Sequence, residues 1–176
     1  SQVPHPSSFI LLPSSWDRFR WLALPALGSL MLLAAILIKA TSPGPVFYRQ
    51  QRVGEFGRVF PMLKFRTMRV GADELQVDLE HRNEADGALF KISDDPRVTP
   101  VGKFLRRFSI DELPQLFNVM MGDMSLVGPR PERQFFVDDL ISKIPYYAVR
   151  HSVKPGVTGW AQVRYEYGST IEDSVE

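Results

Sequence analysis

The sequence predicts an α/β fold, in which a small mostly antiparallel sheet is flanked by helices, with amphipathic interface helices and one N-terminal re-entrant membrane helix. Three observations support this prediction. Residues 21–38 form an apolar run without charge, residues 46–67 contain two strand-like segments around a glycine-bounded turn, and residues 101–108 place apolar side chains at helical spacing among basic ones. At 176 residues the chain is long enough for one domain with a hydrophobic core.

The composition narrows the classes of function. A formal net charge of +1 does not indicate a nucleic-acid partner, because proteins that bind nucleic acid usually carry a marked basic excess. The absence of cysteine excludes disulfides, thiolate metal sites and cysteine nucleophiles, and it fits a reducing compartment. We therefore expect no nucleic acid among the partners of this chain.

The N-terminal part divides into two segments. Residues 1–15 are rich in proline and serine and are predicted to be a linker. Residues 16–41 are predicted to form a membrane-inserted helix, because 18 uncharged residues at about 1.5 Å each barely match a hydrocarbon core of about 30 Å. Pro25 and Gly28 weaken its first half, and basic residues flank both ends. A re-entrant helix satisfies both flanks; a simple span and a buried core helix are the alternatives, in that order.

A hairpin is predicted next, with strands at residues 46–51 and 58–67 around the turn at 53–57. Side chains alternate along a strand, so Lys64 and Arg66 would share one face while Phe65 points to the other. Two cations on one strand face suit a diphosphate. A solvated strand face explains the same pattern equally well.

Helices and one further strand are predicted after the hairpin. Residues 71–86 are strongly charged and indicate an exposed helix or arm. Thr99 and Pro100 suit the cap and first position of a basic amphipathic helix, which could face a core or an anionic membrane surface. Residues 132–144 are predicted to be helical, and residues 153–164 to be a turn followed by a strand-like run.

The stretch from residue 108 to 133 carries the chemistry that the sequence can predict. Ser109 and Glu112 have the spacing of a capping box, which would place Asp111 and Glu112 at the start of a helix, although Pro114 also allows a start a few residues later. A helix start and nearby cations hold an anion, and a carboxylate there can attack it or hold a metal on it. The plainer interpretation is that the acidic pair complements the helix dipole and the arginines form a solvated face.

Four segments then indicate a family. They are SPGPVFYRQQRVG (42–54), KFRTM (64–68), DPRVTPVGKFLRRFSIDELPQLFNVMMGDMSLVGPRPER (95–133) and RHSVKPGVTGWAQVRYEYG (150–168). With these segments in order, the chain resembles the monotopic polyprenyl-phosphate phosphoglycosyl transferases, the bacterial sugar transferase family, from about residue 30 to 176. The last segment resembles the exopolysaccharide-initiating branch most.

The resemblance implies transfer of phospho-sugar from a UDP-sugar to undecaprenyl phosphate with release of UMP, as the first membrane step of exopolysaccharide or other surface-glycan synthesis. It implies that Asp111 forms a covalent phospho-sugar intermediate, that Glu112 is its dyad partner, and that both hold Mg²⁺. The phosphate and nucleotide would be bound by Lys64, Arg66, Arg106 and Arg130. Of these, Lys64, Arg106 and Arg130 match family positions, and Arg66 is included from the strand pattern described above.

The resemblance also implies the setting. Residues 42–176 would be a cytoplasmic catalytic domain at the cytoplasmic face of the bacterial inner membrane, with UDP-sugar, undecaprenyl phosphate and membrane lipid as partners. Members of the family continue beyond the position of residue 176, so we expect a C-terminally truncated domain. The sequence does not decide whether the chain forms a homo-oligomer, and no residue pattern identifies the sugar. The alternative functions are a catalytically silent membrane-bound module that binds a nucleotide-sugar or a partner enzyme, and, more weakly, a soluble phosphate-binding domain.

Overall fold

The computed structural model describes residues 15–83, 92 and 94–164. The chain divides into two compact units, Ser1–Leu33 and Ala34–Glu176, and each is described by itself. The first unit contains most of helix α1 (Ser15–Thr41), whose final turns belong to the second unit. Nearly all of the predicted linker, residues 1–14, lies outside the described residues. The predicted mixed α/β class is confirmed for the part of the chain that the structure describes.

Helix α1 confirms the predicted apolar helix and continues through Pro25 without interruption. Its segment Ala23–Thr41 is long and apolar enough to cross a membrane, with a mean hydropathy of 2.0. Within the second unit, Ala34 and Ile38 are buried, with 2% and 3% of their surface exposed. The re-entrant path through a membrane stays a prediction.

The predicted hairpin is confirmed. Strands β1 (Phe47–Val53) and β2 (Val59–Phe65) pair in antiparallel register, with Phe47 opposite Phe65. Those two rings stack with their centroids 5.4 Å apart. A short 3₁₀ turn (Glu55–Gly57) joins the strands, and its last residue has a φ of +75°, which glycine adopts without strain. This hairpin places Lys64 in the middle of the second unit.

The prediction of one mostly antiparallel sheet is wrong in part. Strands β3 (Ser125–Val127) and β4 (Gly156–Thr158) form a separate, parallel pair. The backbones of these two segments approach so closely that a Cβ on Gly156 would lie 2.1 Å from the backbone nitrogen of Gly128. The run 153–164 is strand only at β4, because residues Trp160–Arg164 form helix α6.

Most of the predicted helices are present. Helix α3 (Pro100–Arg107) begins at Thr99, whose Oγ1 accepts a hydrogen bond from the Gly102 nitrogen at 2.9 Å, so the predicted cap is confirmed. Helix α5 (Gln134–Lys143) confirms the predicted helix at 132–144. In the charged segment predicted over residues 71–86, the described part contains the short helix α2 (Glu74–Asp78) and the 3₁₀ turn Glu80–Arg82, and residues 84–86 lie outside the described residues.

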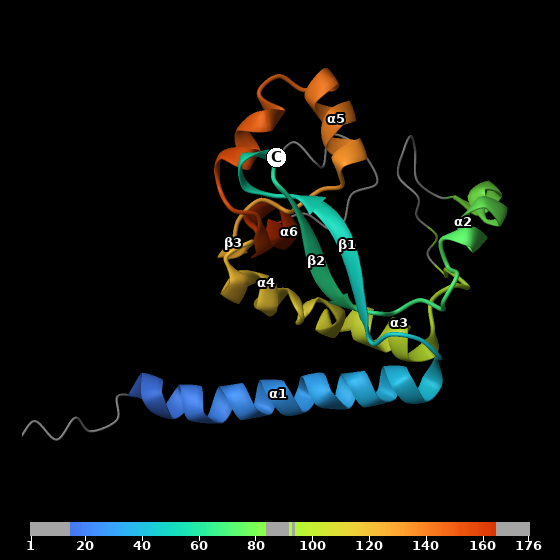
Figure 1. The fold of residues 1–176 in the computed structure, drawn as a ribbon, viewed down its shortest axis with the longest axis vertical. Coiled ribbons are helices and arrows are strands. Elements are labelled where there is room, and N and C mark those ends of the chain that lie inside the picture. Colours follow the sequence, from blue (N-terminus) through green and yellow to red (C-terminus); the bar gives the residue numbers. More distant parts are fainter. Residues whose placement is uncertain (1–14, 84–91, 93, 165–176) are drawn as a thin grey trace, which may run out of the picture. The chain divides into compact units, whose positions relative to one another are not determined.

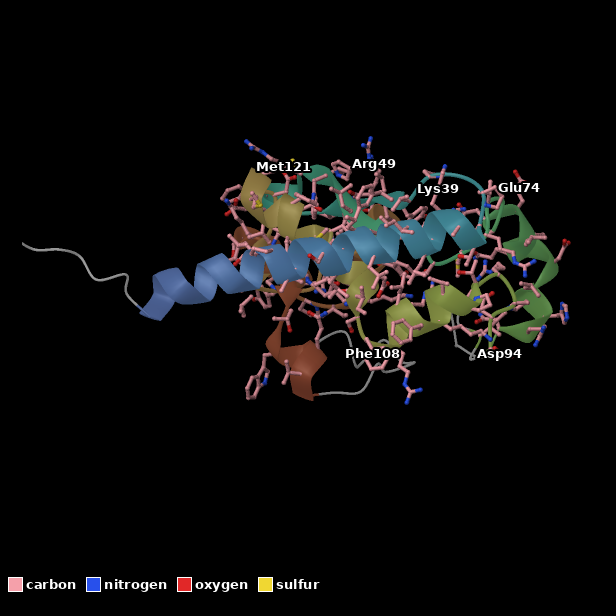
Figure 2. The ribbon with its side chains drawn as sticks, turned by 90° about the horizontal axis from the view of Figure 1, so that it is seen from below. Lys39, Arg49, Glu74, Asp94, Phe108 and Met121 are labelled. Atoms are coloured by element: carbon pink, nitrogen blue, oxygen red, sulfur yellow. The ribbon has the colours of Figure 1, made fainter. Side chains whose placement is uncertain are left out.

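The hairpin contributes Phe60, Met62 and Phe65 to the buried core of the second unit. Helix α4 (Gln115–Met121) packs against β2 and α5 packs against β1 (Figure 1). Phe60, Met62 and Met124 form a buried cluster, against which Val119 and Val157 pack. Some large apolar side chains lie on the surface. Phe108, just after α3, and Met121, the last residue of α4, are labelled in Figure 2, and they are 57% and 62% exposed.

Candidate active site

The acidic pair lies in a short turn between α3 and α4. Ser109 has a left-handed backbone, with a φ of +54°, and its side chain makes no capping hydrogen bond. Asp111 and Glu112 fall in the 3₁₀ turn Ile110–Glu112, and α4 begins only at Gln115, after Pro114. The predicted capping box is therefore wrong. The later start that Pro114 allowed is the one observed, because Ser109 turns the chain away from a helical path.

Two cations converge on one oxygen of Glu112. Lys64 Nζ lies 2.7 Å from Glu112 Oε1, and Arg130 Nη2 lies 3.7 Å from the same atom. The three side chains come from β2, the turn before α4 and the loop after β3. Burial alone would raise the pKa of Glu112, but Lys64 and Arg130 outweigh it and hold that pKa below its ordinary value. Glu112 is therefore an ionised carboxylate between two cations.

Asp111 has a different environment. Only 9% of its surface is exposed, and burial raises its pKa, with a further contribution from the negative charge of Glu112. The positive charges of Lys64 and Arg106 oppose that rise. Among the described residues, no ion pair within 4 Å includes Asp111. It is thus a poorly hydrated carboxyl whose ionisation depends on neighbouring cations.

Arg106 reaches this region from the last turn of α3. Its Nε donates a hydrogen bond to Thr67 Oγ1 at 2.8 Å, and Thr67 is buried directly after β2. The helix approaches so closely at Gly102 that a Cβ there would lie 2.1 Å from the Thr67 carbonyl oxygen. The close packing of α3 on the end of β2 therefore places Arg106 within electrostatic reach of Asp111.

Arg66 lies elsewhere. Strand β2 ends at Phe65, so Arg66 lies beyond the regular alternation that would have put it beside Lys64. Its guanidinium is buried and donates to Ser42 Oγ at 3.2 Å, to the Ser42 carbonyl at 2.9 Å and to the Pro43 carbonyl at 2.5 Å. The structure thus brings five of the six predicted site residues together and holds Arg66 at the loop after α1. The catalytic and binding roles stay predictions.

A pocket of about 200 Å³, counting its open mouth, lies beside the Lys64–Glu112 pair. Its lining combines the predicted residues with several that sequence reasoning missed: Arg52, Met62, Lys64, Glu112, Gln115, Arg130, Pro131, Gly156 and Val157. Three of these side chains are cations and one is a carboxylate, so the pocket suits an anion. The hairpin register could have found Arg52, because it alternates with Gln50 and with Tyr48, which lies opposite Lys64.

A metal site here would rest on few protein ligands. Among residues 15–83, 92 and 94–164, no group of three or more histidine, aspartate or glutamate side chains could hold an ion. Asp111 and Glu112 are adjacent carboxylates beside the pocket. Mg²⁺ commonly takes one or two carboxylates together with waters and phosphate oxygens, so this donor set fits Mg²⁺ when a phosphate ligand is bound.

Comparison with known proteins adds an independent observation. Residues 16–176 match the family described as bacterial sugar transferase. The chain is 48% identical over 153 residues to the UDP-N-acetylgalactosamine-undecaprenyl-phosphate N-acetylgalactosaminephosphotransferase of Aeromonas hydrophila, covering 87% of this chain and 34% of that protein. It is 48% identical over 151 residues to the UDP-glucose:undecaprenyl-phosphate glucose-1-phosphate transferase of Xanthomonas campestris pv. campestris, covering 86% and 29%.

A protein of the same name from Escherichia coli (strain K12) is 45% identical over 136 residues, covering 77% of this chain and 27% of that protein. The chain therefore spans about a third of the length of these curated relatives. The matched residues include the complete hairpin, the acidic turn and the loop that carries Arg130, because the family match runs from residue 16 to 176.

Proposed function

Because this chain belongs to the bacterial sugar transferase family, we propose that it transfers phospho-sugar from a UDP-sugar to undecaprenyl phosphate and releases UMP. The relatives are named for transfer of a sugar phosphate to undecaprenyl phosphate, with UDP-glucose or UDP-N-acetylgalactosamine in their names. In this proposal the reaction is the first membrane step of exopolysaccharide or other surface-glycan synthesis.

One observation carries the proposal: Lys64 and Arg130 converge on Glu112 at a pocket lined by cations, and the buried Asp111 precedes Glu112 in the chain. A carboxylate that approaches a diphosphate meets strong charge repulsion. Fixed cations offset that repulsion, and they act most strongly where water is largely excluded. Cations that line the pocket and a neighbouring carboxylate therefore support a diphosphate as the substrate group.

In the proposed covalent step, Asp111 is the nucleophile. An oxygen of Asp111 attacks the phosphorus that bears the sugar. The bond from that phosphorus to the bridging oxygen breaks, and UMP leaves with the bridging oxygen. An oxygen of undecaprenyl phosphate then attacks the acyl phosphate, which frees the Asp111 carboxylate and gives a lipid diphosphate sugar. Lys64, Arg106 and Arg130 bind the phosphates throughout, and Glu112 keeps Lys64 and Arg130 in place.

Asp111 and Glu112 would hold Mg²⁺, which would supply positive charge to the phosphate oxygens when bound. The proposed setting is the cytoplasmic face of the bacterial inner membrane, with α1 inserted as a re-entrant helix. The apolar segment Ala23–Thr41 supports insertion, because its length and hydropathy suit a bilayer. Insertion beside the domain would bring the lipid carrier within reach of the site.

The test is UMP release from a panel of UDP-sugars with undecaprenyl phosphate and Mg²⁺, which also identifies the sugar. We expect release by the wild type, almost none by Asp111→Asn, and full release by the control Asp139→Asn, which changes the partly exposed ion pair with Lys143 on α5. Intact-protein mass spectrometry without lipid acceptor should detect one phospho-sugar added to the wild type alone. Equal release by wild type and Asp111→Asn contradicts the covalent mechanism. UDP-sugar binding by the wild type without any release favours the silent module.

A further inference from the structure

We propose that Arg150 is a positioning residue, which holds the Arg130 side chain at the pocket by binding the main-chain carbonyl of Arg130. Arg150 Nη2 donates to that carbonyl oxygen at 3.0 Å. Arg150 does not line the pocket itself, and it lies 20 residues after Arg130 in the sequence. The inference rests on the proposed function, because it concerns how the phosphate site is held.

The backbone of residues 129–132 is held through its carbonyl groups. This segment belongs to no helix or strand, yet each of its four carbonyl oxygens accepts a hydrogen bond from another part of the chain. The donors are Gly156 N to Pro129 O at 3.0 Å, Arg150 Nη2 to Arg130 O at 3.0 Å, Arg52 Nη1 to Pro131 O at 3.0 Å, and Val53 N to Glu132 O at 2.9 Å.

These acceptor bonds matter more here than in an ordinary loop. Pro129 and Pro131 have no N–H group, so half of the segment cannot donate to a neighbouring strand. The position of the segment therefore depends on its carbonyls. Two of the four donors are arginine side chains, from β1 and from the 3₁₀ turn Tyr147–Ser152. A guanidinium can bind a carbonyl from a distance that a backbone N–H could not reach.

Arg150 is itself held rigidly. Its guanidinium carbon lies 4.6 Å from the centre of the Tyr147 ring, and its Nη1 donates to the Tyr147 hydroxyl oxygen. Tyr147 is 7% exposed, so the ring is a fixed platform within the second unit. A planar guanidinium that stacks on an aromatic face loses little further freedom when it forms a directed hydrogen bond. Arg150 therefore links the buried Tyr147 ring to the Arg130 carbonyl and fixes the Arg130 backbone relative to that ring.

Arg52 makes an equivalent bond to Pro131 but is a less informative residue to change. It lines the pocket and pairs with Glu132 at 3.3 Å, so its removal alters the charge of the site directly. Removal of Arg150 leaves every side chain of the pocket in the sequence unchanged. An effect on phosphate binding then acts through the position of Arg130, whose Nη2 lies 3.7 Å from Glu112 Oε1, or through the lost charge of Arg150, and a double-mutant cycle separates the two.

A double-mutant cycle tests the proposal, with UDP as the binding probe and UMP release as the second readout. We expect Arg150→Met to weaken UDP binding and to raise the KM for the UDP-sugar by about tenfold, with a smaller change in kcat. Arg130→Ala should do the same. In the double variant the loss should equal that of Arg130→Ala alone, because no side chain remains to be positioned. Lys143→Met, at an exposed ion pair on α5, is the control and should match the wild type.

Additive losses in the double variant, or unchanged UDP binding in Arg150→Met, would overturn the proposal. If Arg150→Met fails to fold, Tyr147→Phe tests the same link, because it keeps the ring and removes only the hydroxyl that holds Arg150. It should weaken UDP binding several-fold in the wild type and not in Arg130→Ala. A wild type that neither binds UDP nor releases UMP overturns both this inference and the proposed function. A fully active wild type with additive losses overturns this inference alone.

Discussion

Lys64 and Glu112 lie 48 residues apart in the sequence, and their side chains meet at 2.7 Å between Nζ and Oε1. Each side chain is mostly buried, with 17% and 22% exposed. One comes from the second strand of the hairpin and the other from the turn that precedes α4. Their contact joins the two parts of the second unit that the proposed chemistry needs, a cation for the diphosphate and the acidic pair.

Removal of the Lys64 charge should reduce activity strongly. Lys64→Met removes the cation that lies 2.7 Å from Glu112 and withdraws a positive charge that favours ionised Asp111. We expect UMP release to fall by about a hundredfold or more, as when one preorganised charge is removed from other active sites. Lys103→Met is the control, because Lys103 forms an exposed pair with Asp94. Activity within twofold of the wild type for Lys64→Met would show that this cation does not serve the reaction.

Asn118 should be essential for stability. It is completely buried; its Oδ1 accepts from the Leu63 nitrogen at 2.9 Å, and its Nδ2 donates to the Pro61 carbonyl at 2.9 Å. The side chain thus acts as a neighbouring strand for β2 and fixes α4 against it. Asn118→Ala leaves buried backbone groups without partners, so we expect a loss of about 2–4 kcal/mol in the free energy of unfolding. Thermal unfolding in detergent measures this loss. A melting temperature equal to that of the wild type would contradict the strand-like role.

The buried pair of Asp95 and Arg97 should make stability depend on pH. Arg97 binds both oxygens of Asp95, at 2.6 Å from Nη2 to Oδ2, and its hydrogen bond lowers the pKa of Asp95 below 3.8. The folded protein therefore binds fewer protons there than the unfolded chain. The stabilisation is complete above the unfolded pKa and disappears as the pH falls through the folded pKa.

Asp95→Asn should accordingly destabilise the protein at neutral pH by about 3 kcal/mol, because it leaves a buried guanidinium without its counter-charge. A fall of about 5–10 °C in the melting temperature corresponds to this loss. The difference from the wild type should shrink below pH 4. Asp94→Asn is the exposed control and should change little. A difference that persists at acid pH would assign the effect to packing rather than to the ion pair.

The path of α1 can be tested with single cysteines, because the chain contains none. Cysteines at Ser15 and at the exposed Ala40 lie at opposite ends of the helix. In sealed inverted vesicles, a membrane-impermeant maleimide should label both positions if the helix re-enters the same face. Labelling of one position in inverted vesicles, and of the other only in right-side-out vesicles, would establish a span. Release of the protein from the vesicles by an alkaline wash without detergent would place the helix outside the bilayer.

Local sequence signals predict the hairpin and the start of α3. Strand alternation and the glycines at 54 and 57 specify β1 and β2, and the Thr99 hydroxyl specifies the first turn of α3, because each signal acts within a few residues. Lys64 was accordingly placed on the correct strand. The same reasoning fails at Arg66, because the strand ends one residue earlier and the loop after α1 captures the guanidinium.

The parallel pair of β3 and β4 leaves almost no local signal. Each strand has three residues, and their pairing depends on close approach of Gly128 and Gly156, which only the folded chain shows. The capping box failed for a similar reason, because the left-handed backbone at Ser109 is set by tertiary packing. Asn118 and Arg150 act through hydrogen bonds to backbone groups far away in the sequence, and no spacing rule connects them to the residues they hold.

The segment that carries Arg130 takes two of its four anchors, Arg150 and Gly156, from residues that follow it in the chain. During synthesis the ribosome releases α1 and the acidic turn well before these anchors emerge. A nascent polypeptide would therefore reach the lipid surface with Asp111 already exposed but with its phosphate grip unfinished. Translation itself would delay the assembly of this phosphate site until residues 150–156 have emerged.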